Sequence, residues 1–507
     1  MVATGQMDAH LMCKKALEDG AQMSECSDAV THFRTRAYKH FPFAMDTYSQ
    51  NFNSQTTFGR ESQITLNRSG DLAWFMYLHV ELPGIVGCDG TDAAQCAGLG
   101  PGSAYPVATG QGRDRDTQFF RSRIPNFDNL PEDEQERQLT EARNAWRRNA
   151  YGEAAEISCC AGEAADDSPE ALCEELEDSQ IWCTWINNVG HGMIKEIKLN
   201  IGGVTIDKIT GLQMACWEEM TGRAGKRLTE MTGRRYTQGQ IFCDSRADRH
   251  LYIPIPFWFS VNSGAALPLM ATTYHYINIH VTFEPLHKLI VVGSPNVAVR
   301  CARTGYAITP QDLVASLETT YIYLTDLEIT KWTNPGPEGF KQLIVQHQSL
   351  SMTVPGRGAS RINVNFNHPN KMLFIVVRRQ SNLDQNSWLN FSGVDGRDPI
   401  KSLDLKLNST SRFTNSSNKP ASYWRTVVPY QFFSNIPETF IYCVNFALRP
   451  EDTINPSGSL NLSKIDNVEL VLDMQDALAG ETMQVDIMSR NWNMLRFADG
   501  VAGISFT

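Results

Sequence analysis

Few residues in this 507-residue chain have the types and spacing that metal binding or catalysis requires. His275 and His280 stand in one run with strand-like alternation. Their odd separation places the two side chains on opposite faces of a strand, so they cannot share one metal ion. A cupin-type site would need histidines two residues apart with a glutamate close by. We therefore interpret both histidines as structural residues with local partners.

Two glycine pairs and one acidic run also fail to match known ligand sites. Gly356-Arg357-Gly358 and Gly100-Pro101-Gly102 lack the lysine and the following helix of a phosphate-binding loop, so they predict turns. The acidic run from Asp166 to Asp178 lacks the alternate-residue spacing and the glycine of a calcium loop. It predicts a solvated charged face.

The twelve cysteines contain no CxxC pair and no zinc-type spacing. Some lie among apolar residues and predict small buried side chains: Cys183, Cys216, Cys243 and Cys443. Others lie in a loop-like region and could oxidise or remain free thiols: Cys88 with Cys96, and Cys159 with Cys160. Sequons occur at Asn67, Asn390, Asn408, Asn415 and Asn461, and without a signal-peptide pattern we interpret them as chance occurrences. The sequence thus predicts no catalytic, cofactor-binding or metal-ligating residue, and no cofactor.

The composition limits the possible partners. Hydrophobic residues make up 42% and charged residues 20% of the chain, as in ordinary globular proteins. The net charge is −11 and no cluster of Lys and Arg occurs, so we predict no direct nucleic-acid binding. No stretch reaches the roughly 18 apolar residues that span a bilayer. We expect the chain to be made and kept in the cytoplasm.

Period-two alternation dominates the elements that would have to position any site, and it predicts half-buried strands. Pro254 and Pro256 cannot donate to a strand ladder, so their run predicts an edge strand. Turn residues such as Pro355-Gly356 separate the runs, which indicates a sandwich, jelly roll or barrel. The alternating runs are 72–82, 251–259, 277–283 and 317–323, and then, in the second half, 350–354, 362–366, 403–407, 468–474 and 483–487.

Helices and irregular segments are fewer. Residues 131–156 and 211–222 predict helices, and Thr309-Pro310 predicts a helix start. Two long insertions, 84–180 and 286–316, interrupt the strands, and loops of this length are usually functional or disordered. Asn334-Pro335-Gly336-Pro337 predicts a break between two units, somewhere between residues 325 and 340.

Several segments, in this order and spacing, resemble the major capsid proteins of nucleocytoplasmic large DNA viruses, such as iridoviruses, phycodnaviruses and marseilleviruses. The resemblance covers roughly residues 40–83 and 190–507. It departs from the family in the length of insertion 84–180 and in the linker 325–340, which lacks an arginine-rich stretch. The segments are 57–60 (TFGR), 67–72 (NRSGDL), 197–208 (IKLNIGGVTIDK), 251–259 (LYIPIPFWF), 266–269 (ALPL), 274–275 (YH), 320–324 (TYIYL), 365–369 (NFNHP), 446–450 (FALRP), 456–467 (PSGSLNLSKIDN) and 491–496 (NWNMLR).

The resemblance implies an all-β fold of two consecutive eight-stranded antiparallel jelly rolls, with long insertions and a few short helices. The expected organisation is an N-terminal arm at 1–39, a first jelly roll at 40–327, a linker at 328–343 and a second jelly roll at 344–507. It implies a non-enzymatic major capsid protein whose homotrimers tile an icosahedral shell in the virion. Assembly in the host cytoplasm, contacts with minor capsid and penton proteins, and indirect contact with an internal membrane are further implications.

Two other functions remain open at this point: a minor or penton-type shell protein with the same roll, and a carbohydrate-binding jelly roll. Strand counting adds one expectation about the insertions. If residues 193–206 form one strand and residues 266–271 another, insertion 84–180 follows the third strand and 286–316 the seventh. Successive strands run antiparallel, so both insertions would leave the same end of the sandwich, joined there by residues 381–399 of the second roll. We expect that end to face outward.

Overall fold

The computed structural model describes residues 40–85, 182–222, 225–236, 240–241, 244–245, 248–293, 313–333, 339–412 and 419–506. The described residues from Ala44 onward form one compact unit. The predicted arm 1–39, nearly all of insertion 84–180 and the centre of insertion 286–316 lie outside the described residues. So do the helix expected at 131–156, the helix start at Thr309-Pro310, the acidic run and the sequon at Asn415.

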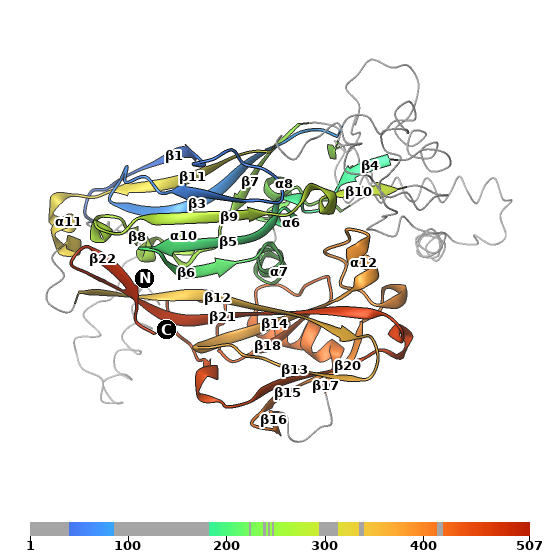
Figure 1. Cartoon of the computed structure of the whole chain (residues 1–507). Coiled ribbons are helices and arrows are strands. Elements are labelled where there is room, and N and C mark those ends of the chain that lie inside the picture. Colours follow the sequence, from blue (N-terminus) through green and yellow to red (C-terminus); the bar gives the residue numbers. More distant parts are fainter. Residues whose placement is uncertain are drawn as a thin grey trace, which may run out of the picture. The chain divides into compact units, whose positions relative to one another are not determined.

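The first jelly roll consists of two antiparallel sheets that pack face to face (Figure 1). One sheet has the order β1-β11-β3-β7, with the short β8 paired to β3; the other has the order β2-β9-β5-β6. The strands of the first sheet are β1 (Ala44–Asn51), β11 (Val314–Tyr323), β3 (Leu72–Leu82), β7 (Arg249–Pro254) and β8 (Leu267–Pro268). Those of the second are β2 (Glu61–Thr65), β9 (Ile277–Phe283), β5 (Ile194–Ile201) and β6 (Val204–Ile209).

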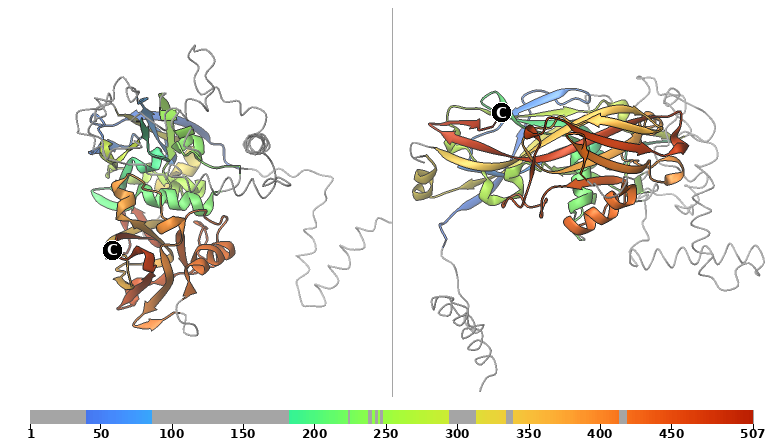
Figure 2. Two further views of the ribbon diagram at one scale, coloured as in Figure 1. Left: turned by 90° about the vertical axis from the view of Figure 1, so that its right-hand side faces the viewer. Right: turned by 90° about the horizontal axis from the view of Figure 1, so that it is seen from below.

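The second jelly roll repeats the strand order of the first. One sheet runs β12-β21-β14-β18 and the other β13-β20-β15-β16, with β19, β22 and β17 as short additions. In the left view of Figure 2 the strands of each roll form a separate group. The strands are β12 (Phe340–Pro355), β21 (Thr482–Ala498), β14 (Pro369–Arg379), β18 (Ile441–Asn445), β13 (Ala359–Asn363), β20 (Val468–Met474), β15 (Ile400–Leu407), β16 (Thr410–Ser411), β17 (Lys419–Pro420), β19 (Leu460–Asn461) and β22 (Val501–Ile504).

Burial follows the alternation seen in the sequence. In β9, Ile277, Ile279, Val281 and Phe283 are buried while the residues between them are only partly covered. This arrangement is what a strand with one face on a core requires. The predicted all-β double roll is confirmed, and β12 begins at Phe340, inside the segment expected to be a linker.

Three details of the predicted strands are wrong. The run 251–259 is a strand only to Pro254, because after Pro256 the chain turns into helix α10 (Trp258–Val261). Residues 193–206 are not one strand: β5 and β6 form a hairpin whose turn, Gly202-Gly203, has positive φ at both residues. Residues 266–271 contain only the two-residue strand β8 before a 3-10 turn. The two counting errors cancel, so the two insertions still follow strands that end at the same side.

The predicted edge position of the proline-containing strand is confirmed, since β7 is the last strand of its sheet. The predicted helix at 211–222 is α7 (Gly211–Thr221), which a Thr210–Gln213 capping box begins. Further short helices are α6 (Val189–Gly192), α8 (Thr229–Thr232), α11 (Asp326–Thr333), α12 (Gln380–Asp384) and α13 (Val428–Phe432). No helix of the described residues has the length and apolar content to cross a bilayer.

Candidate assembly surfaces and the cavity between the rolls

The described ends of the two insertions meet in a two-stranded ribbon. β4 (Trp182–Trp185) follows insertion 84–180 in the sequence and pairs antiparallel with β10 (Ile290–Gly293), which lies near the start of insertion 286–316. Trp185 Nε1 donates to Pro83 O at 3.1 Å, which ties the ribbon to the end of β3. The expectation that both insertions leave the same end of the first roll agrees with this pairing.

The segment between β14 and β15 of the second roll contacts the first roll at the end where the two insertions leave it. The Asn386 amide donates to His287 O at 2.8 Å and to Ile290 O at 2.7 Å. The Trp388 indole donates to Asn187 O at 3.1 Å. Residues 381–399 therefore lie beside the base of both insertions, as strand counting predicts.

The rolls are joined by a buried polar contact between β6 and β12. Asp207 accepts the backbone N–H of His347 at 2.8 Å through Oδ1, and its Oδ2 lies 2.9 Å from His347 Nδ1. Gln346 donates to Ile206 O and contacts Asn493 of β21. Burial lowers the pKa of His347, and the neighbouring Asp207 carboxyl opposes this effect.

Helix α7 packs the first roll against β14 and β21 of the second. The Arg490 guanidinium stacks 3.7 Å from the centroid of the Trp217 ring, and burial lowers its pKa to about 10. Trp217 also lies near Phe374, with 6.2 Å between ring centroids. Gln213 donates to Gln348 O at 3.0 Å. The outer face of β12 and β21 is thus covered by the first roll's own strand β6 and by α7.

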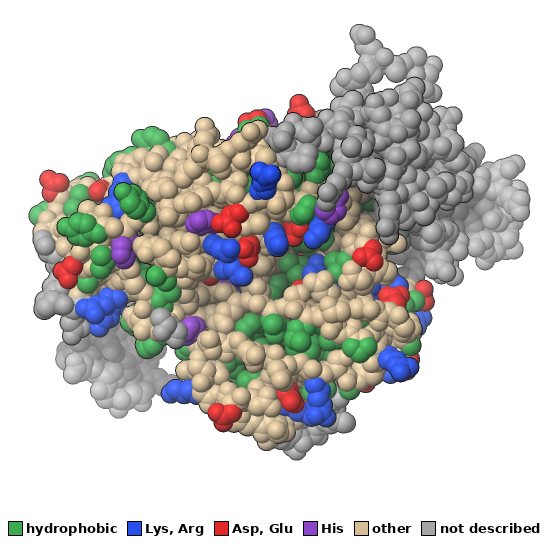
Figure 3. All heavy atoms as spheres, in the orientation of Figure 1, with side chains coloured by type: hydrophobic (Ala, Val, Ile, Leu, Met, Phe, Trp, Pro, Cys, Tyr) green, Lys and Arg blue, Asp and Glu red, His purple; other side chains and the backbone are tan. Residues whose placement is uncertain are grey.

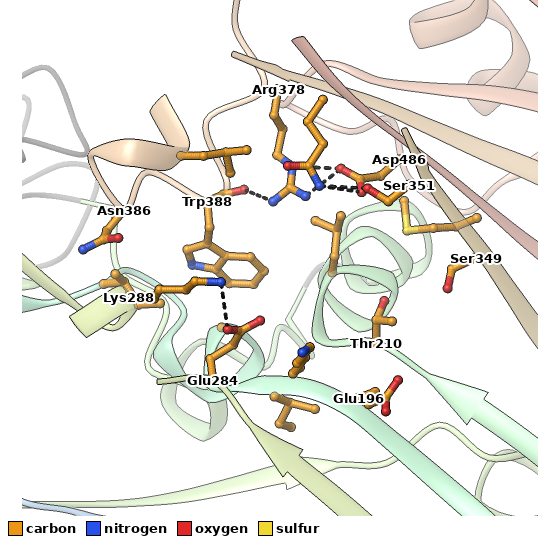
Figure 4. Close-up of a pocket in the computed structure, with 18 of the residues that line it drawn as sticks. Glu196, Thr210, Glu284, Lys288, Ser349, Ser351, Arg378, Asn386, Trp388 and Asp486 are labelled. Atoms are coloured by element: carbon orange, nitrogen blue, oxygen red, sulfur yellow. Dashed lines mark hydrogen bonds and ion pairs between the residues drawn. The ribbon is translucent and has the colours of Figure 1, made fainter. Parts of the chain in front are cut away.

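A cavity of about 510 Å³ opens along the line where the rolls meet. Figure 3 shows hydrophobic side chains in the hollow between the two sandwiches. In the close-up of Figure 4, Trp388 lies beside the Glu284–Lys288 pair, and Arg378 faces Asp486. The ion-pair distances are 3.3 Å for Lys288–Glu284 and 2.6 Å for Arg378–Asp486.

Most of the charged side chains that line this cavity are paired with neighbours. Glu196 has Lys198 at 2.6 Å and Lys208 at 3.3 Å, and hydrogen bonds from these lysines lower its pKa against the opposing effect of its burial. A carboxyl that acts as a general acid near neutral pH has a raised pKa, and the lowered pKa of Glu196 is a shift in the opposite direction. The cavity is thus a seam between the rolls that is lined largely by ion-paired side chains.

The residues that the sequence singled out lie apart from one another. His275 Nδ1 accepts the backbone N–H of Ala502 at 3.2 Å, and His280 Nδ1 lies 2.7 Å from Glu61. The two histidines thus have separate local partners, as predicted. Cys216 and Cys443 are buried free thiols whose pKa is raised by burial. Cys183 and Cys243 lie outside the residues whose side chains are described.

Gly356-Arg357-Gly358 forms the turn between β12 and β13, with Gly358 at a φ of 69°, so the prediction of a turn is confirmed. One cluster was missed by sequence reasoning. His79, Glu81 and His250 lie close together on β3 and β7. Only the two-residue spacing of His79 and Glu81 was visible in the sequence, because His250 is distant along the chain.

Exposed apolar side chains of the described structure include those on β1 and on the segment after β16. Every residue of β1 is exposed except the half-buried Gln50, and Met45 is 52% exposed. In the second roll, the segment after β16 carries Tyr430 of α13, which is 77% exposed, and Ile436, which is 42% exposed. Large apolar side chains left open in this way mark protein–protein contacts when they gather on one face.

Comparisons with known proteins match both rolls in order. Residues 165–325 match the family described as major capsid protein N-terminus, and residues 340–503 match the large eukaryotic DNA virus major capsid protein. The chain belongs to the major capsid protein family of large eukaryotic DNA viruses. The resemblance seen in the sequence is confirmed.

Individual members of the family match over nearly the whole chain. The major capsid protein of Chrysochromulina ericina virus is 23% identical, over 94% of this chain and 96% of that protein. The Faustovirus major capsid protein has a TM-score of 0.63 at 10% identity, over 98% of this chain and 99% of that one. A quasi-atomic model of the PBCV-1 virus capsid gives 0.61 at 18% identity, over 94% and 100%. These structures support the double jelly-roll fold, and the family is one of structural capsid proteins.

Proposed function

We propose that three copies of this major capsid protein form a capsomer with a pseudo-hexagonal outline, and that such capsomers tile an icosahedral shell. The observation that carries the proposal is the repeated strand order of the two rolls. Two similar rolls in each chain supply six similar units to a trimer. Three identical contacts between chains then alternate with three contacts within chains to close one ring.

We infer the surfaces that meet between chains from the equivalent surfaces that meet inside the chain. Within the chain, the outer face of β12 and β21 rests on β6 and α7 of the first roll. By strand order, β1 and β11 are the first roll's counterparts of β12 and β21. In the first roll, α7 lies in the segment after β6. The equivalent segment of the second roll follows β16 and includes α13.

Both of these counterparts carry exposed apolar side chains in the described part of the chain. Met45 lies on β1 and Tyr430 on α13, and both are exposed apolar side chains. We infer that β1 and β11 of one subunit pack on the α13 segment of the next. The contact is heterologous, because two different surfaces meet, and it closes after three chains.

The trimer is tested by light scattering on the purified full chain, with expected mass three times the chain mass of 56.8 kDa. Met45→Asp and Tyr430→Asp each place a charge in the proposed contact and should shift the protein toward monomer. Leu448→Asp is the matched control, since Leu448 is 76% exposed and lies on neither surface. A wild-type monomer at micromolar concentration contradicts the trimer. Trimers that tolerate both contact variants contradict only the assigned surfaces.

We further propose that insertion 84–180 belongs to the outward end of the capsomer. Support comes from its base: β4 and β10 pair there, and the second roll's Asn386 and Trp388 bind beside them. One end of each roll must face the inner layers of the shell, and long solvent-facing loops tolerate change best. An antibody against residues 84–180 should bind intact particles. Failure to bind, with good binding to the isolated chain, would place the insertion inside.

The remaining implications are proposals about the particle. The protein acts through surface complementarity and not as an enzyme, it contacts minor capsid and penton proteins, and an internal membrane lies beneath the shell without direct contact. Assembly takes place in the host cytoplasm. The net charge of −11 favours a shell that does not contact DNA directly. Filter binding with duplex DNA at physiological salt should show no submicromolar, salt-dependent affinity.

A further inference from the structure

Three side chains with metal-binding atoms converge on the outer face of the first roll, away from the cavity between the rolls. The ligand atoms of His79, Glu81 and His250 all lie within 4.8 Å of one another. Their meeting follows from the strand register. His79 and Glu81 are two residues apart on β3 and so share a face, and Glu81 is directly paired with His250 of β7.

The two imidazoles face each other at a spacing that suits one metal ion. His79 Nε2 lies 3.2 Å from His250 Nδ1. Imidazole nitrogens bind zinc at about 2.0–2.1 Å, so two of them on a tetrahedral ion are roughly 3.3–3.4 Å apart. The observed distance therefore needs little adjustment. Glu81 is exposed and supplies a carboxylate on the same side.

Neighbouring side chains orient His79 as outer-shell partners orient a ligand. Its other ring nitrogen, Nδ1, lies 3.3 Å from Ser316 Oγ on β11. When Nδ1–H donates to that hydroxyl, Nε2 keeps the lone pair that a metal needs. Tyr252 stacks on the His79 ring with 4.6 Å between centroids and an interplanar angle of 19°, which restrains the ring plane. In that tautomer of His79, the 3.2 Å contact without metal requires His250 Nδ1–H as the donor and His79 Nε2 as the acceptor.

We propose that His79, Glu81 and His250 form a binding site for Zn²⁺. Two imidazoles and one carboxylate are ligands that zinc accepts, and water completes a tetrahedral shell. On binding, His250 changes to its Nε2–H tautomer, so its Nδ1 lone pair faces the ion and the charge of the histidine pair is unchanged. The ion links the edge strand β7 to β3, near the point where insertion 84–180 leaves β3. The site is complete within one chain and does not depend on the trimer.

The test measures metal in full-length protein expressed with added zinc, so that the ion is present before subunits assemble. Wild-type protein should contain one more zinc per chain than His250→Gln. The zinc contents of the two proteins are compared with each other, because zinc bound by any of the twelve cysteines is the same in both and cancels. Co²⁺ substituted for zinc should give the strong visible absorption of a tetrahedral complex in wild type, and this absorption should be lost in His250→Gln.

Further variants distinguish loss of the zinc site from nonspecific effects of substitution on the protein. Glu81→Gln and Ser316→Ala should each weaken zinc affinity at least tenfold, since loss of an outer-shell partner alone costs about 10–100-fold. His280→Gln is the matched control, because His280 is also a strand histidine beside a glutamate, with Glu61 at 2.7 Å, and it should keep the wild-type zinc content. Wild-type zinc content and Co²⁺ absorption in folded His250→Gln protein would overturn the proposal, and so would wild-type protein without the extra zinc.

Discussion

At the scale of single residues, the contact between Asp207 and His347 joins the two rolls. Both side chains are almost fully buried, at 0% and 5% exposure, and Asp207 satisfies both the backbone N–H and the ring of His347. Asp207→Ala leaves two buried donors without a partner, so we expect a loss of about 3 kcal/mol in unfolding free energy. Urea denaturation measures it.

The matched control for that prediction is Asp476→Ala. Asp476 is 88% exposed and pairs with Lys401 at 2.7 Å, and an exposed ion pair contributes about 0–1 kcal/mol. Equal losses of unfolding free energy in both variants would show that the buried contact stabilises the fold no more than an exposed ion pair does.

His347 also predicts a pH dependence. Burial lowers its pKa in the folded protein, so below about pH 6.5 the unfolded chain takes up a proton that the folded chain does not. Stability is therefore lost as the pH falls from about 6.5 toward the lowered folded-state pKa. His347→Gln removes the titrating group and keeps a donor for Asp207. As the pH falls from 7.5 to 5.5, the melting temperature of this variant should fall less than that of wild type. Equal falls in melting temperature for the two proteins would contradict the prediction.

At the scale of elements, α7 determines how the first roll covers the second. Thr210 accepts from Gln213 N at 3.2 Å, and the Gln213 side chain accepts from Thr210 N at 3.0 Å. Thr210→Ala removes the cap and should cost about 0.5–2 kcal/mol. Thr210→Ser keeps the hydroxyl and should recover most of it. Chemical denaturation compares the three proteins, and an unchanged Thr210→Ala midpoint would mean that packing alone holds α7.

At the scale of the whole chain, strand β21 links the two hydrophobic cores. Its first half contributes Met483, Val485 and Ile487 to the second core, while Leu495 and Phe497 belong to the first. Because one strand serves both cores, we expect the rolls to unfold in a single calorimetric transition.

Leu495→Ala tests this coupling. The residue is fully buried, and the substitution should cost about 2–5 kcal/mol and lower the one transition as a whole. Val204→Ala, at a site 55% exposed, is the control and should change stability by less than about 0.5 kcal/mol. Two separate transitions, with only one shifted by Leu495→Ala, would show that the rolls unfold independently.

Sequence patterning was sufficient to predict which residues of β9 and β20, and of β3 from Met76 on, face a core, because strand alternation is a local property that burial of one face enforces. At the start of β3 the prediction fails: Ala73 is buried and Trp74 only partly so, beside an irregularity in the pairing with β11. It also predicted the edge position of β7 from Pro254, since proline lacks the N–H that an inner strand donates. The family resemblance then supplied the double roll. Short-range patterns failed where a turn or helix interrupted the alternation, as at Gly202-Gly203 and after Pro256.

Which distant residues meet depends on how the strands assemble in three dimensions. Asp207 and His347 are 140 positions apart, and His79 and His250 are 171 apart. No local pattern encodes such a pair, because each strand's alternation specifies its faces but not its neighbour. Pairing β3 with β7, and packing β6 on β12, depends on the closure of long loops and on the fit of whole sheets. The proposed zinc site and the contact between the rolls are products of that closure.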